Sequence, residues 1–474
     1  MKQLSDCSFR KYCSLSVILV LLLCFVPGAN AYVLLDPTFG NEGLVVTDVA
    51  GYFDDVDSIA VDDQNRIVAA GSTRNGTNYD FALFRYTASG DLDNTFGNGG
   101  IVSIDLSGDL DEATSVAIDA DGKIIAAGSA KNNDGYQDFA VVRYLETGEP
   151  DLSFGDDGIV TTNILSTDLG ESCVIDGNGK IVVAGYAYDG IYGYFGVARY
   201  EESGDLDTTF GTDGIVTTDF GRKQDHAYSC AVDSQGRIVV AGIATNPDFR
   251  SDFGVARYLD SGDLDNTFGG DGKVTTDIGD EGDHRAYACT VDSEDRVIVA
   301  GITHNGGTSF QDNDFAVVRY LENGNLDPAF GDGGIVITDF YGSYDHALSV
   351  EIDAEGRIVV AGYSENAQGN NDFAMARYLD NGDLDESFGN GGKVTTDLSN
   401  SVDYGHSCAI DSTGRIILAG SSGSPIDERD VFMARYIETD ELPSDGGGCN
   451  IASISGIAGM LLLPVLFIVA RMRK

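Results

Sequence analysis

One turn sequence, written seven times, constrains the fold of this 474-residue chain more than any other feature. The copy "GDLDNTFGNGG" occupies residues 90–100, and its near-copies recur every 56 to 62 residues. Their phenylalanines are Phe39, Phe96, Phe154, Phe210, Phe268, Phe330 and Phe388. A fixed period of this length indicates one repeat architecture rather than several unrelated domains.

Four short apolar runs fill each repeat. In the second repeat they are "TSVAID" (114–119), "KIIAAGS" (123–129), "DFAVVRY" (138–144) and "GIVTTNI" (158–164). Such runs are rich in Val, Ile, Phe and Tyr and are separated by turn residues, which is typical of β-strands. Seven repeats of four consecutive strands predict an all-β chain folded as a seven-bladed β-propeller.

The two ends of the repeat region complement each other. A lone strand, "GLVVTDV" (43–49), precedes the first complete repeat, and the last repeat ends at "DVFMARY" without its fourth strand. We therefore expect the N-terminal strand to complete the last blade, which removes two exposed sheet edges. An open β-solenoid is the alternative fold, and it would not need this complementarity.

The whole repeat "GDLDNTFGNGGIV…SVAIDADGKIIAAG…DFAVVRY" resembles the bacterial delta-60 repeat, over about residues 35–437. The resemblance implies a propeller-like secreted or surface protein. It implies no particular activity, because none is general to that family.

The segments outside the propeller are interpreted as targeting signals. A basic leader, an apolar core and Ala29-x-Ala31 predict a signal peptide at 1–31, cleaved after Ala31. The propeller is expected at 32–440, followed by a Gly-rich linker with Cys449 at 441–450. Residues 451–470 are uncharged and long enough for a transmembrane or sorting helix, and the basic tail 471–474 is expected to be cytoplasmic.

This tail resembles the Gly/Cys-type C-terminal sorting signals of bacterial envelope proteins, with Gly447, Gly448 and Cys449 as the processing residues. The resemblance implies a processed protein that is anchored at the cell surface. An uncleaved membrane anchor is the alternative. In both cases the chain is secreted across the inner membrane, and the propeller lies outside the cytoplasm.

The net charge limits the classes of partner that the chain is expected to bind. The chain has 29 basic and 76 acidic residues, a net charge of −47, which disfavours nucleic acid and favours cations or basic partners. It contains no nucleophile elbow, phosphate-binding loop or dinucleotide fingerprint in a suitable context. We expect a monomeric, non-enzymatic scaffold that binds an extracellular protein, glycan or cation, with Ca²⁺ as a possible cofactor.

The loops that join the second strand to the third, and those that join the fourth strand to the next blade, differ among repeats, unlike the repeated turns. A ligand is therefore expected on the face that carries these loops and at the channel mouth.

Acidic residues recur eight positions before the aspartate that ends each first strand. They are Asp54, Asp111, Asp168, Asp225, Asp345 and Asp403, and the fifth blade has His284 there with Asp283 beside it. A ring of such acids would suit Ca²⁺. The alternative is that each closes a loop or pairs with a buried arginine.

Arginine precedes tyrosine in every third strand and is expected to be structural, because a buried guanidinium keeps its charge and needs a carboxylate. The seven residues are Arg85, Arg143, Arg199, Arg257, Arg319, Arg377 and Arg435.

Four histidines carry the alternative function. His226, His284, His346 and His406 are expected in the loops before the first strands of blades four to seven. Channel histidines can act as general bases or metal ligands, so a propeller lyase or hydrolase is the second hypothesis.

Four cysteines share one register, which Ile59, Val116 and Val350 hold in the other blades: Cys173, Cys230, Cys289 and Cys408. Because inner strands of neighbouring blades lie too far apart for a disulfide, these cysteines are predicted to be free thiols.

Overall fold

A computed structural model describes ten ranges of the chain: 32–49, 54–74, 78–106, 110–221, 224–279, 282–304, 313–342, 344–398, 402–424 and 428–439. These ranges contain 29 strands and no helix. Within them, accordingly, no helix is long and apolar enough to span a membrane. The expected signal peptide, linker and C-terminal span lie outside the described residues.

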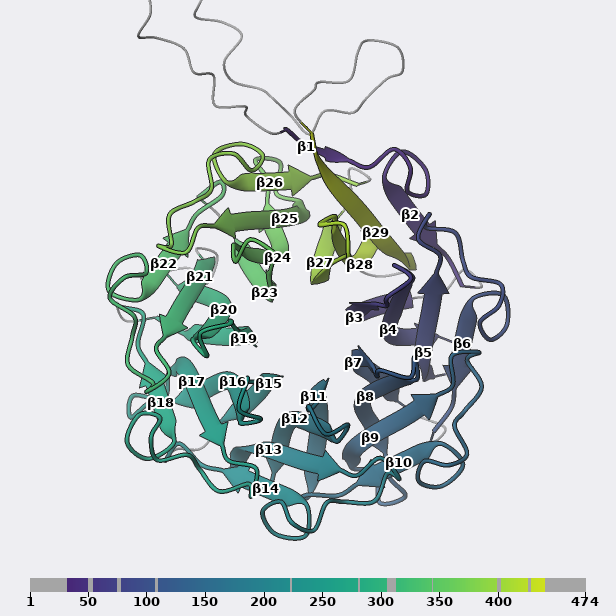
Figure 1. Cartoon of the computed structure of the whole chain (residues 1–474), viewed down its shortest axis with the longest axis vertical. Coiled ribbons are helices and arrows are strands. Elements are labelled where there is room, and N and C mark those ends of the chain that lie inside the picture. The colour runs from purple at the N-terminus through teal and green to yellow at the C-terminus, as the bar shows by residue number, and fades with distance from the viewer. Residues whose placement is uncertain are drawn as a thin grey trace, which may run out of the picture.

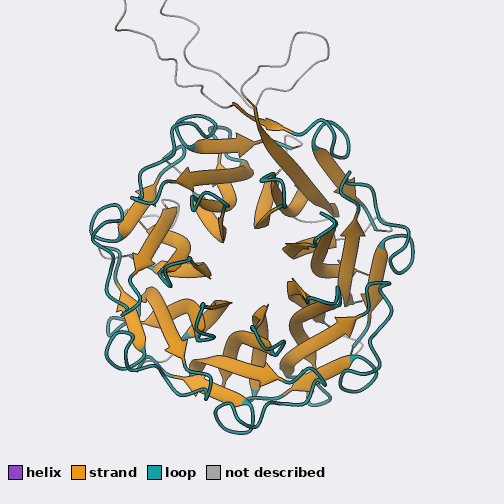
Figure 2. Cartoon of the chain, viewed as in Figure 1, coloured by secondary structure: helices purple, strands orange, loops and turns teal. Residues whose placement is uncertain are grey.

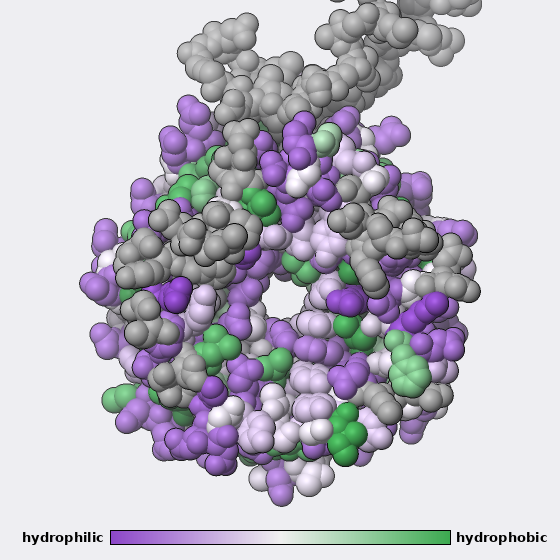
Figure 3. All heavy atoms as spheres, turned by 180° about the vertical axis from the view of Figure 1, so that it is seen from behind, coloured by the Kyte–Doolittle hydropathy of each residue, from purple (hydrophilic) through white to green (hydrophobic). Residues whose placement is uncertain are grey.

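Seven antiparallel sheets surround a central channel (Figures 1 and 2), and the channel is open in the space-filling view from behind (Figure 3). Blade 1 consists of β3 (Asp54–Val61), β4 (Ile67–Arg74), β5 (Tyr79–Tyr86) and β6 (Ile101–Ile104). The predicted seven-bladed propeller is confirmed.

Blades 2 to 6 repeat this order from the innermost strand outward. Blade 2 is β7 (Asp111–Ile118), β8 (Ile124–Lys131), β9 (Gln137–Tyr144) and β10 (Ile159–Thr162); blade 3 is β11 (Thr167–Ile175), β12 (Ile181–Tyr188), β13 (Gly193–Tyr200) and β14 (Ile215–Thr218). Blade 4 is β15 (His226–Val232), β16 (Ile238–Thr245), β17 (Ser251–Tyr258) and β18 (Lys273–Thr276). Blade 5 is β19 (His284–Val291), β20 (Val297–His304), β21 (Asn313–Tyr320) and β22 (Ile335–Thr338); blade 6 is β23 (Asp345–Ile352), β24 (Ile358–Glu365), β25 (Asn371–Tyr378) and β26 (Lys393–Thr396).

The seventh blade joins the two ends of the chain. It consists of β27 (Val402–Ile410), β28 (Ile416–Ser424) and β29 (Glu428–Thr439), and β2 (Leu44–Thr47) pairs with β29 as the outer strand. This confirms the expected closure. A second N-terminal strand, β1 (Tyr32–Leu35), pairs with the far end of β29, which the sequence analysis did not anticipate.

Adjacent blades are held together at the inner strands by backbone-to-serine hydrogen bonds. The amide of Val116 donates to Ser58 Oγ at 3.2 Å, and the amide of Ile59 donates to Ser407 Oγ at 3.1 Å across the junction of blades 7 and 1. Cys173, Cys230, Cys289 and Cys408 make the same backbone contact at their junctions. All four are buried free thiols, as predicted.

At the rim, the repeated turn binds the buried arginines. Arg257 Nε donates to Asp265 Oδ2 at 2.9 Å, and its Cζ lies 4.7 Å from the centre of the Phe268 ring. Its Nη1 donates to the Glu322 carbonyl of the next blade at 2.6 Å. We call this arrangement the rim lock, and it explains why the turn recurs.

Every blade has a rim lock. The pairs are Arg85–Asp93, Arg143–Asp151, Arg199–Asp207, Arg257–Asp265, Arg319–Asp327, Arg377–Asp385 and Arg435–Asp36. The sequence suggested a buried arginine as one partner for Asp54 and for its equivalents in the other blades, and that interpretation is wrong. The aspartate inside each "LDxxFG" turn lies against the guanidinium instead.

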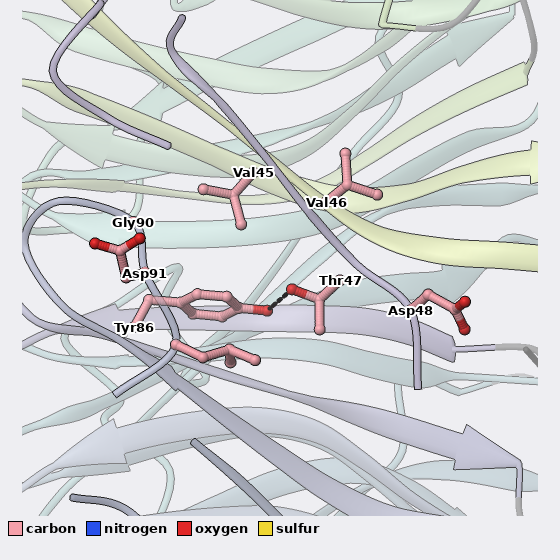
Figure 4. Close-up of a pocket in the computed structure, with 8 residues that line it drawn as sticks. Val45, Val46, Thr47, Asp48, Tyr86, Gly90 and Asp91 are labelled. Atoms are coloured by element: carbon pink, nitrogen blue, oxygen red, sulfur yellow. Dashed lines mark hydrogen bonds between the residues drawn. The ribbon is translucent and has the colours of Figure 1, made fainter. Parts of the chain in front are cut away.

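Tyrosines next to these arginines connect blades through the outermost strands. At the closure, Tyr86 Oη donates to Thr47 Oγ1 at 2.8 Å, beside a shallow hollow lined by Val45, Val46 and Asp48 (Figure 4). One junction differs. At the junction of blades 1 and 2, Ile104 takes the place of the threonine, and the buried Tyr144 hydroxyl has no hydrogen-bond partner.

Candidate channel site

The seven innermost strands line the channel, and each contains a β-bulge. In every blade, one residue of the innermost strand has no partner in the second strand and is left out of the ladder. Bulges re-aim side chains and often occur beside functional sites. The bulged residues are Asp57, Thr114, Glu171, Tyr228, Tyr287, Leu348 and His406.

A glycine in the second strand makes each bulge possible. A Cβ on Gly301 would lie 1.9 Å from the Arg285 carbonyl oxygen, so only glycine fits opposite the bulge. The same backbone contact, at 1.8 to 2.0 Å, occurs at Gly71, Gly128, Gly185, Gly242, Gly362 and Gly420.

The residue two positions before each bulge also varies from blade to blade. These residues are Asp55, Glu112, Leu169, His226, Arg285, His346 and Tyr404. The columns that flank these two variable columns stay almost constant, with aspartate before them and serine after them. The column between them holds only Val, Ala or Gly. The backbone of the channel lining therefore repeats seven times, whereas its side chains differ from blade to blade.

Carboxylates from blades 1 to 3 form one side of the channel. We call Asp55, Asp57, Glu112 and Glu171 the acidic wall. Burial raises the pKa of Glu112 to about 7, and the charges of Asp57, Glu171 and Asp55 add to the shift. These groups interact across three blades, which places them around one space.

Two histidines partner the acidic wall at its ends. His406 Nδ1 lies 3.2 Å from Asp57 Oδ1, and His226 Nε2 lies 2.8 Å from Glu171 Oε1. Burial would lower the pKa of His406, but Asp55 and Asp57 overcome it and raise that pKa to about 9. His406 is therefore charged at neutral pH. It still reaches solvent, with 19% of its side chain exposed.

Aromatic side chains from blades 3 to 7 form the opposite side. We call Tyr186, Tyr228, Tyr287, Tyr363 and Tyr404 the aromatic wall. Their rings follow one another: Tyr228 and Tyr287 have centroids 5.1 Å apart, and Tyr363 and Tyr404 are 5.0 Å apart. His226 stacks between two of them, 4.7 Å from Tyr186 and 4.1 Å from Tyr228.

His346 is embedded in the aromatic wall and differs from His406 in charge. Its ring lies 4.9 Å from Tyr363, whose hydroxyl is 3.0 Å from His346 Nδ1. Burial and the charge of Arg285 lower the pKa of His346 to about 4. One channel thus holds a neutral histidine and a charged histidine, a separation that suits acid–base roles.

The predicted histidines do not all serve the channel. All four lie in or at the start of inner strands rather than in the loops where they were expected. His226, His346 and His406 line the channel. His284 is fully buried in the aspartate column, 2.9 Å from Thr303 Oγ1, and is not brought together with the others.

The predicted acidic ring does not line the channel. Asp54, Asp111, Asp168, Asp225, Asp345 and Asp403 are all fully buried between blades. Asp54 accepts from the Val49 amide at 2.6 Å, and Asp225 accepts from the Phe220 amide at 2.8 Å. These bonds close the loop from one blade to the next, which is the loop-closing role.

Among the described residues, three groups could hold a metal ion with ligand atoms within 4.8 Å of one another. One is Asp55, Asp57 and His406 in the channel; the other two combine members of the acidic ring with further aspartates between blades. The channel group would fit a metal only when His406 is deprotonated.

Sequence reasoning missed most of the channel lining. Asp57, Glu112, Glu171, Tyr228 and Tyr287 were not singled out, because period-two strand patterns do not reveal a bulge. The signal was present as an unvarying glycine in each second strand and two varying columns opposite it.

The fold and site define a seven-bladed propeller of near-identical repeats with an asymmetric channel. Six segments match the family model described as "Domain of unknown function (DUF5122) beta-propeller": residues 65–96, 120–154, 177–210, 234–268, 295–330 and 354–388. These matches fit the expected delta-60-like repeat propeller. No curated protein matches the chain in sequence.

Solved structures share the general shape at low similarity. A protein of unknown function from Dyadobacter fermentans has 11% identity and a TM-score of 0.44, covering 83% of this chain and 97% of its own. The polysaccharide lyase Uly1 has 12% identity and a TM-score of 0.47, covering 89% and 95%. Sqt1 of Chaetomium thermophilum, bound to the N-terminus of ribosomal protein L10, has 10% identity and a TM-score of 0.40, covering 79% and 85%. Likeness at this level carries no inference about activity.

Proposed function

We propose that this chain is an extracellular, surface-anchored binding propeller whose channel takes a positively charged segment of a partner protein. The observation that carries the proposal is the pair of facing walls, one of carboxylates and one of tyrosines. Arg429 of the chain itself makes both contacts at one end of the walls, with Nη1 3.7 Å from Asp55 Oδ2 and Cζ 4.8 Å from the centre of the Tyr404 ring. An ammonium or guanidinium group of a partner would gain the same two contacts from the remaining carboxylates and tyrosines.

The net charge supports the same class of ligand. At −47, the chain attracts a basic segment at long range and repels a polyanion. In the part of the chain that the structure describes, the rim-lock aspartates offer no comparable site, because each is already paired with an arginine. The terminal segments support the extracellular location, through the expected signal peptide and C-terminal anchor.

Binding is tested on the full chain in mild detergent, with a fluorescent peptide of alternating lysine and arginine. The double variant Glu112→Gln/Glu171→Gln should weaken binding at least ~10-fold, equivalent to ~1.4 kcal/mol. Its matched control is Asp63→Asn/Asp121→Asn, which removes two exposed charges from the hairpins between first and second strands and should change binding less than ~2-fold. Equal weakening by both pairs would reduce the effect to net charge and contradict a channel site.

The anchor is tested separately. Removal of residues 446–474 should release the propeller into the culture medium, because the expected span is lost. Retention of the truncated protein on cells would contradict the anchor.

A second candidate is acid–base cleavage of a glycan in the same channel. The specific observation is the spread of pKa values, with His346 at about 4, Glu112 at about 7 and His406 at about 9. Cleavage of neutral and uronate-containing glycans should then follow a bell-shaped pH profile and be lost in His346→Ala. If the full chain cleaves no such glycan, the second candidate is rejected and binding remains as the proposed function.

A further inference from the structure

The junctions between blades contain aspartates that neither the rim locks nor the channel uses. At the junction of blades 5 and 6, Asp314 is the second residue of β21, Asp339 follows β22, and Asp345 begins β23 of the next blade. One carboxylate oxygen from each lies within 4.8 Å of the others. Asp314 and Asp345 are buried, and Asp339 is exposed, so the cluster opens to solvent on one side.

Two buried oxygens at this junction lack partners. Asp345 is fully buried, and its Oδ1 forms no hydrogen bond; its cross-strand neighbour Ser364 is also fully buried, and its Oγ forms none. At the same place in other blades, Thr73 donates to Asp54 and Ser422 donates to Asp403. Ser364 faces Asp345 across the strand pair, but its hydroxyl does not reach the hydrogen-bond geometry that Thr73 and Ser422 have.

Two other junctions replace part of this cluster with a nitrogen. At the junction of blades 2 and 3, Asn163 occupies the position of Asp339, and its Nδ2 donates to Asp138 at 3.0 Å. At the junction of blades 4 and 5, His284 occupies the position of Asp345, with Nε2 3.4 Å from Asp277 Oδ1. In both cases the protein itself places an N–H donor or a titratable nitrogen among the acids.

From these observations we propose that the junction of blades 5 and 6 binds Ca²⁺ through Asp314, Asp339 and Asp345, with Ser364 Oγ as a further oxygen. Carboxylate and hydroxyl oxygens without nitrogen or sulfur suit a hard cation, and Ca²⁺ accepts a wider range of oxygen geometries than Mg²⁺. The analogous group of Asp372, Asp397 and Asp403 lies between blades 6 and 7. The bound ion would connect consecutive blades, which goes beyond the proposed function and does not depend on any channel ligand.

Burial of these carboxylates supports the need for a cation. Asp314 and Asp345 are 2% and 0% exposed, so neither carboxylate reaches bulk water. A buried carboxylate without a neutralising partner costs folding free energy, and a bound cation removes that cost.

Calcium titration of the chelator-treated full chain, followed by calorimetry and by thermal unfolding, tests the site. We expect Ca²⁺ to bind and to raise the melting temperature, and Mg²⁺ to bind at least ~10-fold more weakly, the usual consequence of its stricter geometry. Asp339→Asn, at an exposed position where the amide oxygen can still accept from the Gly342 amide, should remove one bound ion.

Asp345→Asn should remove the same ion and leave the calcium-free protein at least as stable as the parent at pH 7. The matched control is Asp219→Asn, at the junction of blades 3 and 4, where Tyr194 replaces the third-strand acid. It should leave calcium uptake unchanged. Absence of calcium binding at millimolar concentration, or full uptake by both Asp339→Asn and Asp345→Asn, would overturn the proposal.

Discussion

The rim and the channel are built from the same seven repeats but differ in how strictly they repeat. At the rim, arginine, aspartate and phenylalanine recur in every blade with nearly the same geometry, from 4.4 to 4.7 Å between guanidinium and ring. In the channel, the bulge recurs but the side chain it presents changes in almost every blade. A uniform contact serves the ring as a whole, whereas recognition needs different groups at different positions.

The largest effect is expected where the rim closes. Deleting residues 32–50 removes β1 and β2 and leaves Arg435 without Asp36, so the edge of β29 is exposed and a buried charge loses its partner. The cost should exceed the ~3–5 kcal/mol of one unpaired buried charge. Light scattering and thermal unfolding should show aggregation or a much lower melting temperature.

Removal of residues 446–474 is the control for that deletion, because it takes away a longer segment outside the propeller. It should leave the melting temperature unchanged. A deletion of 32–50 that remains monodisperse and equally stable would show that the ring is not closed as described.

Breaking one rim lock away from the closure should cost about as much as one buried charge. Arg257→Ala removes the nearest cation of the buried Asp265 and leaves Arg237, whose Nη1 lies 3.8 Å from Asp265 Oδ2. It should lower the free energy of unfolding by ~3 kcal/mol, the low end of the range for one broken buried pair. Burial works to raise the pKa of Asp265, but bonds from Thr267 and the charge of Arg257 hold it below the usual value. Denaturant unfolding measures the loss.

The double variant Arg257→Leu/Asp265→Leu removes both charges and should recover a large part of that stability. If the single variant loses less than ~1 kcal/mol, the pair behaves as an exposed ion pair and the rim lock is wrong.

The buried acids of the inner strands predict an unusual pH dependence. Burial raises the pKa of Glu351 from 4.5 to about 7, and burial raises the pKa values of Asp54, Asp168 and Asp225 to about 6. The folded state then holds protons that the unfolded state has released, so stability in chelator should fall as pH rises from about 4 to about 7. His346 has the opposite effect: because its pKa is lowered, its contribution to stability rises between about pH 4 and pH 6.5.

Melting temperatures across that pH range test the sign, and Glu351→Gln should flatten the curve. A stability that rises steadily from pH 4 to 7 in chelator would mean that these acids are ionised at little cost. In the region above pH 6.5, loss of the proton on His406 should reduce stability further, because its folded pKa is about 9.

The smallest effect concerns the one irregular tyrosine contact near the rim. Ile104→Thr supplies a hydroxyl for Tyr144 and should stabilise the protein by ~0.5–1 kcal/mol, since an unsatisfied buried group costs ~1–3 kcal/mol and the lost apolar contact offsets part of the gain. Thr162→Ile, which removes the partner of Tyr200, should destabilise it by a similar amount. Equal stability of both variants and the parent would contradict the assignment.

The rim was largely predictable from the sequence, because its period, its strands and its buried arginines repeat in every copy. The partner of each arginine was not, since the repeats offer several recurring aspartates and only packing decides among them. β1 was missed because its pairing depends on the extra length of β29. The channel lining was missed for a different reason: the bulge shifts side-chain direction by one residue, and alternation alone does not show this.

The division between a structural rim and a recognising channel is the central claim, and hydrogen–deuterium exchange of the full chain with and without the basic peptide tests it directly. We expect added protection in the bulged segments of β3, β7, β11, β15 and β19, and no change in the turns that hold Asp93, Asp207 and Asp265. Protection confined to those turns, with the inner strands unchanged, would contradict the claim.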